Sequence, residues 1–587
     1  MTSLRKLLHF LKPYTVLIVI TCLLLLCQTI GNLSLPRFLS NIIDNGITAG
    51  NMNYILRIGV YMIFAAILTS AVGMGAMYTS SKVAMSVGRD LRHALFEKIE
   101  SFSLGEFNNL GTSSLITRTT NDVYQVQQLV VMSLRLMIIA PLMAIGGIVM
   151  AISTNASLSL TLLVSVPVLA LVIFVIGRKT VPLYNQIQTK LDKVNLILRE
   201  NLTGIRVIRA FNKTKYEEER FKEASLDLTN NAIGVNKLMA ILMPGIMIVL
   251  NLTTVAILWF GSRKVSNGLL EVGSLIAFIQ YVMQIMFSLV MLTMIFVLIP
   301  RALASANRIS EVLGILNSIT DKVAPSDIST PSSLTRAHLR FEDVSFTYPG
   351  SQKPILSHIS FDVGPGETLA IIGGTGSGKS TLLNLIPRFY DITSGRILID
   401  SLDIKDYSLT DLRKKIGYVP QKNFLFSGSV ASNLAFGKEN ATEDELTKAL
   451  TTAQGIDFVS SMPEGTHSPI TQGGTNVSGG QRQRLAIARA LMKNAEFYLF
   501  DDSFSALDFK TDSQLRKALA ADVTNSAVII VGQRITSIMH ANTILVLDDH
   551  TIVGKGTHKE LLKNCKTYRE IAESQLSKKE LEGGHAL

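Results

Sequence analysis

GGTGSGKS, residues 373–380, fits the pattern G-x-x-x-x-G-K-[ST] at every fixed position. An apolar run, LAII at 369–372, precedes it, and a helix-like stretch follows. In such a loop, glycines let backbone N–H groups face phosphate oxygens, Lys379 reaches the outer phosphates and the Ser380 hydroxyl can hold Mg²⁺. A chance glycine-rich turn is the alternative, but the flanking strand and helix favour a nucleotide-phosphate site. The residues expected to bind phosphate are Gly373, Gly374, Thr375, Gly376, Ser377, Gly378, Lys379, Ser380 and Thr381.

The composition indicates a membrane protein. The chain has 587 residues, of which 48% are hydrophobic and only 17% charged, and its mean hydropathy is positive. A net charge of +11 could indicate nucleic-acid binding, but in a membrane protein a Lys/Arg excess more often faces the cytoplasm and anionic lipid. We therefore expect a lipid bilayer as a partner and no nucleic acid.

Uncharged runs in the first half predict membrane spans. The stretch 136–177 has 42 residues, about 63 Å as a helix and twice a hydrocarbon core of about 30 Å. It is expected to form two spans, with the polar residues Thr154 to Ser157 as the turn. Six spans are predicted in a membrane domain of residues 1–316, at about 14–36, 58–81, 131–153, 158–180, 238–262 and 272–300.

The loops between the spans predict the orientation. Residues 82–135 carry six Lys/Arg and residues 178–237 carry twelve, whereas the opposite side carries few. These two long connections, the N-terminus and the second half of the chain are therefore expected in the cytoplasm. Helical patterns continue into both connections, so the tips at 111–122 and 209–216 are expected to touch a cytoplasmic domain.

A second domain is predicted at 339–587, after a polar linker at 317–338 that contains prolines and Ser/Thr clusters. Short β-rich runs alternate there with helical ones, which is typical of an α/β domain with some antiparallel strands near its start. The predicted fold class is an α-helical membrane domain of six transmembrane helices with cytoplasmic extensions, followed by an α/β P-loop domain.

Three further positions in this half suit nucleotide chemistry. Tyr348 lies before the phosphate loop at a strand end, where its ring could stack on adenine or could be an ordinary strand aromatic. Asp501 ends the apolar strand YLFD and is placed to hold Mg²⁺. The segment Ser478, Gly479, Gly480, Gln481 opens a helix and could bind an anion; a simple helix cap would explain Ser478 but not the paired glycines.

Together, the phosphate loop, Ser478 to Gln481, Asp501 and the loop SALD at 505–508 resemble the cassette of the ATP-binding cassette family. With six preceding spans, the chain resembles a half-transporter of the ABC exporters. The resemblance implies ATP and Mg²⁺ as cofactors, Gln421 as a Q-loop residue near Mg²⁺, and Asp508 as part of the nucleotide site. It also implies two cassettes that hold two ATP molecules head to tail, each between the phosphate loop of one chain and the signature, Ser478 to Gln481, of the other.

The sequence departs from the family at the catalytic positions. Asp502 stands where the family has Glu, and a misplacement of about 1 Å can cost on the order of 10²-fold in rate. Gln533 replaces the switch His that senses the γ-phosphate, and it carries no titratable proton. Gln472 replaces the acidic residue usual before the signature. With these changes, the chain resembles the degenerate-site subunit of heterodimeric bacterial multidrug exporters, whose own nucleotide site binds ATP but hydrolyses it slowly.

The sequence thus predicts an ATP-driven exporter of hydrophobic or amphipathic compounds in the plasma membrane of a bacterium. Asp502, Gln533 and Gln421 are its candidate catalytic residues, and Ser380, Gln421 and Asp501 its candidate metal ligands. The expected partner is a second half-transporter with an intact catalytic Glu and switch His. Alternatives are a homodimeric exporter of lipid or peptide and an ATP-gated, channel-like protein.

Overall fold

A computed structural model describes residues 8–321 and 338–576 of the chain. The chain divides into two compact units. The membrane unit comprises Met1–Glu100 and Thr112–Ile315, and the nucleotide unit comprises Ser101–Gly111 and Leu316–Leu587. Most of the expected linker, at 322–337, lies outside the described residues.

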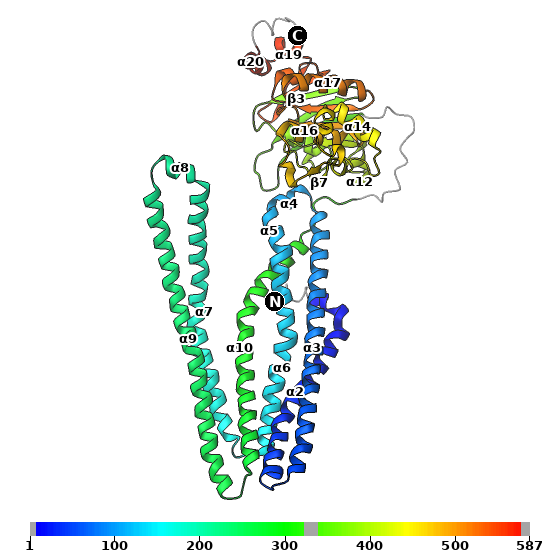
Figure 1. The fold of residues 1–587 in the computed structure, drawn as a ribbon. Coiled ribbons are helices and arrows are strands. Elements are labelled where there is room, and N and C mark those ends of the chain that lie inside the picture. The colour runs from blue at the N-terminus through cyan, green and yellow to red at the C-terminus, as the bar shows by residue number, and fades with distance from the viewer. Residues whose placement is uncertain (1–7, 322–337, 577–587) are drawn as a thin grey trace. The chain divides into compact units, whose positions relative to one another are not determined.

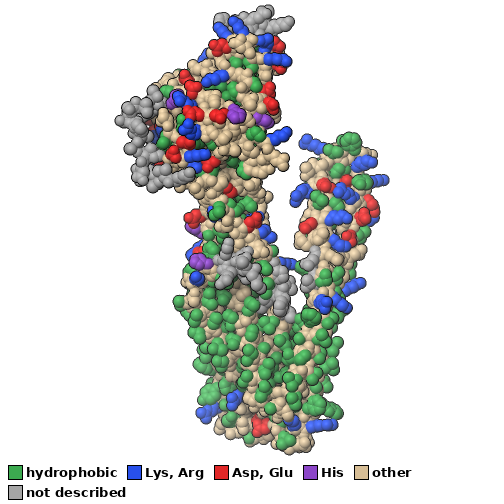
Figure 2. Space-filling view, turned by 180° about the vertical axis from the view of Figure 1, so that it is seen from behind, with side chains coloured by type: hydrophobic (Ala, Val, Ile, Leu, Met, Phe, Trp, Pro, Cys, Tyr) green, Lys and Arg blue, Asp and Glu red, His purple; other side chains and the backbone are tan. Residues whose placement is uncertain are grey.

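The membrane unit is all helical in its described part (Figure 1). Its elements are η1 (Leu8–Tyr14), α2 (Thr15–Asn41), η2 (Ile42–Ile47), α3 (Met52–Glu100), α5 (Thr112–Thr117), η3 (Arg118–Asp122), α6 (Val123–Thr154), α7 (Leu160–Thr203), α8 (Ile205–Ala210), α9 (Thr214–Ser266) and α10 (Val272–Gly314). Six helical segments in the described residues are long and apolar enough to cross a membrane, which confirms the predicted number. Figure 2 shows hydrophobic side chains covering these helices along much of their length.

The long helices pack mainly in pairs. α2 lies along α3, α6 along α10, and α7 along α9 (Figure 1). A buried cluster that includes Leu250, Phe278 and Met286 joins several of these helices. Within it, the buried Tyr281 hydroxyl donates to the Leu33 carbonyl at 3.1 Å, which satisfies a polar group inside an apolar core.

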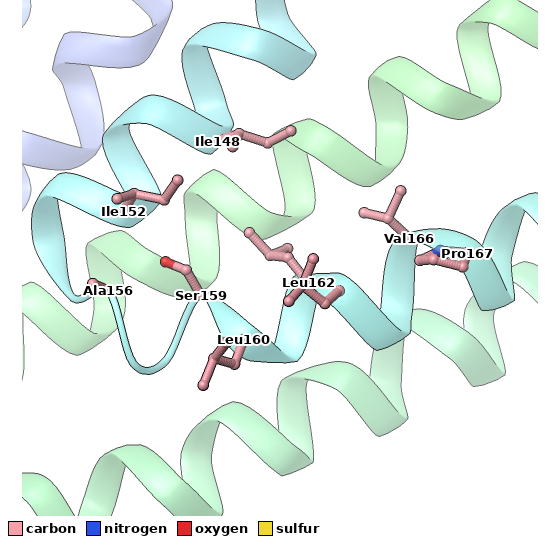
Figure 3. A pocket seen from close by; sticks show the side chains of 9 residues that line it. Ile148, Ile152, Ala156, Ser159, Leu160, Leu162, Val166 and Pro167 are labelled. Carbon is pink, nitrogen blue, oxygen red and sulfur yellow. The ribbon is translucent and has the colours of Figure 1, made fainter.

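The apolar stretch 136–177 is interrupted at the end of α6. Asn155 leaves helical geometry, with φ −159° and ψ 104°, and α7 begins five residues later. The Asn155 side chain accepts a hydrogen bond from the Leu158 N–H at 3.0 Å, which stabilises the turn. Beside this turn lies a pocket of about 420 Å³ lined chiefly by aliphatic side chains such as Ile148, Leu160 and Val166 (Figure 3).

The segment 111–122, predicted as a tip that touches a cytoplasmic domain, is largely helical. Residues 112–122 form α5 and the short π-helix η3, and Asp122 is fully buried. Its carboxylate accepts hydrogen bonds from Arg308 Nε at 2.7 Å and from Ser305 Oγ at 2.8 Å, both on α10. Arg118 pairs with Glu311 at 2.8 Å on the same helix. Arg118 and Asp122 of this segment therefore pack against α10, whereas residues such as Thr117 and Asn121 are exposed.

The nucleotide unit is an α/β structure, as predicted. Its elements are α4 (Leu104–Leu110), β1 (Leu339–Phe346), β2 (Leu356–Val363), β3 (Thr368–Gly373), α11 (Lys379–Leu385), β4 (Ser394–Ile399), β5 (Leu402–Asp403), α12 (Leu409–Lys414), β6 (Ile416–Val419), β7 (Gly428–Ser429), α13 (Val430–Leu434), α14 (Glu443–Thr452), α15 (Ile456–Ser460), η4 (Gly465–His467), β8 (Pro469–Ile470), η5 (Gln472–Gly474), α16 (Gly479–Leu491), β9 (Phe497–Asp501), α17 (Phe509–Asp522), β10 (Ala527–Val531), α18 (Ile535–Ile538), β11 (Thr543–Asp548), β12 (Thr551–Gly556), α19 (His558–Asn564) and α20 (Lys566–Gln575).

A six-stranded sheet of order β12-β11-β3-β10-β9-β6 forms the centre of this unit. β10 pairs in parallel with β3 and β9, and β6 pairs in parallel with β9. Both faces of the sheet are covered: Leu369 and Ile371 face one core and Ala370 and Ile372 the other. Burial on both faces explains why β3, β9 and β10 are continuous apolar runs in the sequence. An antiparallel sheet, β2-β1-β4-β5, covers one of these faces.

The parallel strands determine where the candidate site lies. The carboxyl ends of parallel neighbours meet at one edge of a sheet, and ligands bind there in open α/β folds. The phosphate loop follows β3, Asp502 follows β9, Gln533 follows β10 and Gln421 follows β6. The sheet thus brings together four motifs that are spread over more than a hundred residues of sequence.

Candidate nucleotide site

The phosphate loop needs its glycines for backbone reasons. Gly376 and Gly378 have φ values of +84° and +94°, in the region that favours glycine. A Cβ on Gly378 would approach the Ile355 carbonyl oxygen to 2.7 Å, and one on Gly373 would approach the Leu547 carbonyl oxygen to 2.1 Å. Side chains at these positions would therefore distort the loop.

The polar side chains of this loop fit a phosphate ligand. Lys379 is 9% exposed, and its Nζ donates to the carbonyls of Gly373 and Gly374 at 2.9 and 2.6 Å. Burial lowers the pKa of Lys379, an effect opposed by Asp502 and Asp501. The Ser377 hydroxyl is buried and has no hydrogen-bond partner among the described residues. A buried cation and an unpartnered hydroxyl on one loop suit an anionic ligand.

Tyr348 lies next to this loop. Its hydroxyl is 2.9 Å from Thr381 Oγ1. Its ring makes edge contacts with Phe346 and Tyr390, with centroid distances of 4.9 and 5.2 Å. The two rings hold Tyr348 beside the phosphate loop, which is compatible with a position next to the base of a nucleotide.

Ser380 and Asp501 form the candidate magnesium pair. The Ser380 hydroxyl donates to Asp501 Oδ1 at 2.9 Å, and Asp501 is 3% exposed. Burial raises the pKa of Asp501, and the neighbouring Asp502 raises it further. A cation bound here would relieve both effects, and a hydroxyl beside a carboxylate provides the hard oxygen ligands that Mg²⁺ prefers.

The catalytic corner, which we define as Asp502 and Gln533, forms a direct contact. Gln533 Nε2 donates to Asp502 Oδ2 at 3.1 Å. Asp502 has φ +47°, outside strand geometry, while its N–H still donates to the Val531 carbonyl of β10 at 3.0 Å, one residue past the end of β9. Burial raises the pKa of Asp502, while a hydrogen bond from Gln421 lowers it. The structure thus brings all three predicted catalytic residues together.

The signature forms a separate feature of the unit. Ser478 caps α16 in a capping box: its hydroxyl accepts from the Gln481 N–H at 3.2 Å, and Gln481 Oε1 accepts from the Ser478 N–H at 2.8 Å. A Cβ on Gly479 would meet nothing within 4 Å, so the backbone is open there. In the described part of the chain, no hydrogen bond joins the signature to the phosphate loop.

Asp508 also caps a helix. Its two carboxylate oxygens accept from the Thr511 N–H and Thr511 hydroxyl at 2.9 and 2.8 Å, at the start of α17. The backbone hydrogen bond from Thr511 holds the pKa of Asp508 below its usual range. The structure therefore gives this residue a capping role within its own chain.

The sequence analysis missed the residues of α4. This short helix groups with the nucleotide unit, and Asn108 Nδ2 donates to the Tyr390 hydroxyl at 3.3 Å. Ser103 and Glu106 form a capping box at its start. The pattern S-x-x-E at 103–106 was the available signal for a new helix before the expected tip at 111–122.

Comparisons with known proteins match segments of both the membrane unit and the nucleotide unit. A family model described as "ABC transporter transmembrane region" matches residues 18–289, and one described as "ABC transporter" matches residues 356–505. The chain is 40% identical over 568 residues to "Uncharacterized ABC transporter ATP-binding protein MT1311" of Mycobacterium tuberculosis (strain CDC 1551 / Oshkosh), covering 96% of this chain and 97% of the relative.

Two further matches cover nearly the whole chain. "Putative multidrug export ATP-binding/permease protein YgaD" of Bacillus subtilis (strain 168) is 31% identical and covers 97% of this chain and 99% of the relative. A solved structure described as a bacterial Atm1-family ABC exporter with ATP bound gives a TM-score of 0.77 at 24% identity, covering 97% of this chain and 99% of that chain. The match to the solved structure shows a shared fold.

Proposed function

This chain belongs to the ABC transporter family, and from that premise we propose that it is one subunit of a heterodimeric exporter whose own nucleotide site hydrolyses ATP slowly. The chain is a multi-pass membrane protein and an ATP-driven exporter with an ABC-type ATPase unit, which uses ATP with Mg²⁺. The proposal concerns the division of labour between this chain and its partner.

The catalytic corner is the observation that carries the proposal. Asp502 is one methylene shorter than the usual Glu, and its Oδ2 accepts a hydrogen bond from Gln533 at 3.1 Å. We propose that this short carboxylate, hydrogen-bonded to Gln533, would lie too far from an attacking water, since a displacement of about 1 Å costs on the order of 10²-fold in rate. The Gln533 amide can donate a hydrogen bond but cannot carry a titratable proton.

The remaining site residues support nucleotide binding. In the proposed site, the phosphate loop and Lys379 hold phosphates, and Tyr348 flanks the base. Ser380, Asp501 and Gln421 would hold Mg²⁺, which neutralises phosphate charge when bound. The buried position of Lys379 and the contact between Ser380 and Asp501 fit these roles. The site is therefore proposed to bind nucleotide well and to cleave it slowly.

The intact signature supports a role for this chain in its partner's site. Ser478 to Gln481 keep the residues expected at the start of α16, and the backbone at Gly479 is open. In a head-to-tail pair of cassettes, these groups would complete a site whose phosphate loop belongs to the partner. That partner is proposed to carry the catalytic Glu and switch His that this chain lacks.

Nucleotide binding at the slow site can still drive the cycle. A ligand shifts a conformational equilibrium when it binds one state better than the other, whether or not it is consumed. The contact between Asn108 and Tyr390 offers a route from the nucleotide unit to the chain segment that continues from α3. We infer that this contact helps to couple closure of the cassettes to the spans.

The proposed cargo is a hydrophobic or amphipathic compound. The candidate spans are strongly apolar, and YgaD, named for multidrug export, is 31% identical.

The proposed location is the plasma membrane of a bacterium. The Lys/Arg excess in the two long connections supports a cytoplasmic position for these connections, for the N-terminus and for the nucleotide unit.

Co-purification tests the proposed partner. The chain, tagged at one end and expressed from its own chromosomal locus, is purified in mild detergent. We expect a second half-transporter at a one-to-one ratio, with Glu after its Walker B Asp and a switch His. Recovery of only copies of this chain would overturn the heterodimer and favour the homodimeric alternative.

A transport assay in vesicles tests the channel-like alternative. A pump moves its substrate against a concentration gradient, whereas an ATP-gated channel does not.

A further inference from the structure

The last described helix, α20, reaches back to the switch segment at 533–537. Gln575 Nε2 donates to the Gln533 carbonyl at 2.8 Å, and Gln575 Oε1 accepts from the Ile535 N–H at 2.8 Å. A carbonyl only accepts and a backbone N–H only donates, so these two partners determine which way the amide is oriented. Gln575 thus brackets the backbone on both sides of Arg534.

The helix that carries Gln575 is firmly packed. Tyr568 and Ala572 of α20 are fully buried in the same core as Leu561 of α19. The Tyr568 hydroxyl is 2.7 Å from His558 Nδ1. The position of Gln575 is therefore set by the packing of α20 against the nucleotide unit.

The bond from Ile535 also satisfies a helix end. Ile535 is the first residue of the four-residue helix α18, and the preceding Arg534 provides no side-chain cap. Its N–H would lack an intrahelical partner, as the first N–H groups of any helix do. Gln575 supplies the missing acceptor and thereby fixes where α18 begins.

Other contacts hold the far end of the segment. Arg516 Nη1 on α17 donates to the Thr536 carbonyl at 2.8 Å, and the Ser537 hydroxyl donates to Asp512 at 3.2 Å. Neither contact involves residue 533. Among the described residues, the hydrogen bonds of Gln533 go to Asp502 and Gln575.

We propose that Gln575 is a positioning residue: through the backbone of Gln533 and Ile535, helix α20 sets where the Gln533 amide lies beside Asp502. The inference rests on the proposed function in taking Gln533 as the residue that stands at the γ-phosphate position. It predicts that α20 controls how this site distinguishes a nucleoside triphosphate from a diphosphate.

Two substitutions separate the two hydrogen bonds. Gln575→Glu keeps an acceptor for Ile535 but places a second oxygen against the Gln533 carbonyl, so it converts an attraction into a repulsion. Gln575→Ala removes both bonds. Glu573→Ala changes an exposed side chain of the same helix and serves as the matched control.

The test uses the full-length exporter in lipid nanodiscs. The site is photolabelled with 8-azido-ATP, the label is read on this chain after the subunits are separated, and labelling is competed with AMP-PNP or ADP. We expect both Gln575 variants to weaken competition by AMP-PNP about three- to ten-fold and to leave ADP nearly unchanged. Glu573→Ala should match the unaltered chain.

A double substitution tests whether Gln575 acts through Gln533. Gln533→Ala should lower the preference for AMP-PNP over ADP, and adding Gln575→Glu should lower it little further, because coupled residues are not additive. Equal loss of AMP-PNP and ADP competition, full additivity or an unchanged preference would each overturn the proposal. This experiment measures nucleotide binding and not hydrolysis. A finding of rapid hydrolysis at this site would therefore contradict the slow-site proposal without affecting the test of Gln575.

Discussion

The catalytic corner differs from the pattern of the family it resembles and the signature does not, although both lie in one α/β unit. Asp502 and Gln533 are substituted and bond to each other, whereas Ser478 to Gln481 keep the family residues in a complete capping box. In the proposed dimer the two regions serve different nucleotide sites. Under the proposal, the altered residues belong to the site that this chain builds, and the unaltered ones belong to the site of its partner.

The largest expected effect comes from changing the signature. Gly479→Asp should fold normally, because a Cβ there meets nothing within 4 Å, but its carboxylate would repel nucleotide phosphates at the partner's site. Steady-state ATP hydrolysis by the exporter should fall on the order of 10²-fold. Gly479→Ala, which adds no charge, is the control. Hydrolysis that survives Gly479→Asp would mean that the signature does not serve the active site.

A smaller effect is expected from repairing the catalytic corner. The double variant Asp502→Glu with Gln533→His should raise turnover of the exporter by roughly two-fold, because a second site would hydrolyse beside the first. Asp502→Glu alone should raise it less, because Gln533 still lacks an imidazole. Single-turnover hydrolysis measures the new activity. A full gain from Asp502→Glu alone would show that Gln533 does not limit the site.

The smallest expected effect is a loss of hydrogen-exchange protection at low pH. It should occur beside the catalytic corner and not in the signature. Burial lowers the pKa of His558, which contacts Tyr568 of α20. With α20 undocked, His558 should titrate near 6.5, so the undocked state binds more protons below that pH. Docking should therefore be complete above pH 6.5 and weaken as the pH falls towards the lowered value.

Hydrogen exchange, corrected for its intrinsic pH dependence, can detect this change. The Ile535 amide, bonded to Gln575, should lose protection on acidification, while the Gln481 amide in the signature should not. His558→Gln should remove the pH dependence. Equal losses at both amides would indicate general unfolding and would contradict a local effect of α20.

Much of the fold and the candidate site could be predicted because both leave periodic or compact signals. The apolar runs of β3, β9 and β10 follow from burial on both faces of the sheet, and the phosphate loop, Asp502 and Gln533 each come just after one of these strands. The six spans follow from length and hydropathy alone. These features depend on residues that are close together in the sequence.

The remaining features depend on single polar side chains that meet across long sequence distances. Asp122 lies in a tip that was predicted to touch a cytoplasmic domain, and the structure shows it buried against Arg308 and Ser305. Gln575, which the sequence analysis did not single out, forms hydrogen bonds with the backbone of Gln533 and Ile535. Such contacts carry no periodicity, so only the structure reveals them.

Hydrolysis by the chain purified alone in lipid nanodiscs tests the central claim most directly. With its own phosphate loop, Asp502 and signature as the available parts, the chain should bind ATP but hydrolyse it at least about ten-fold more slowly than the exporter assembled with its partner. Brisk hydrolysis by the chain alone, abolished by Asp502→Asn, would contradict the account.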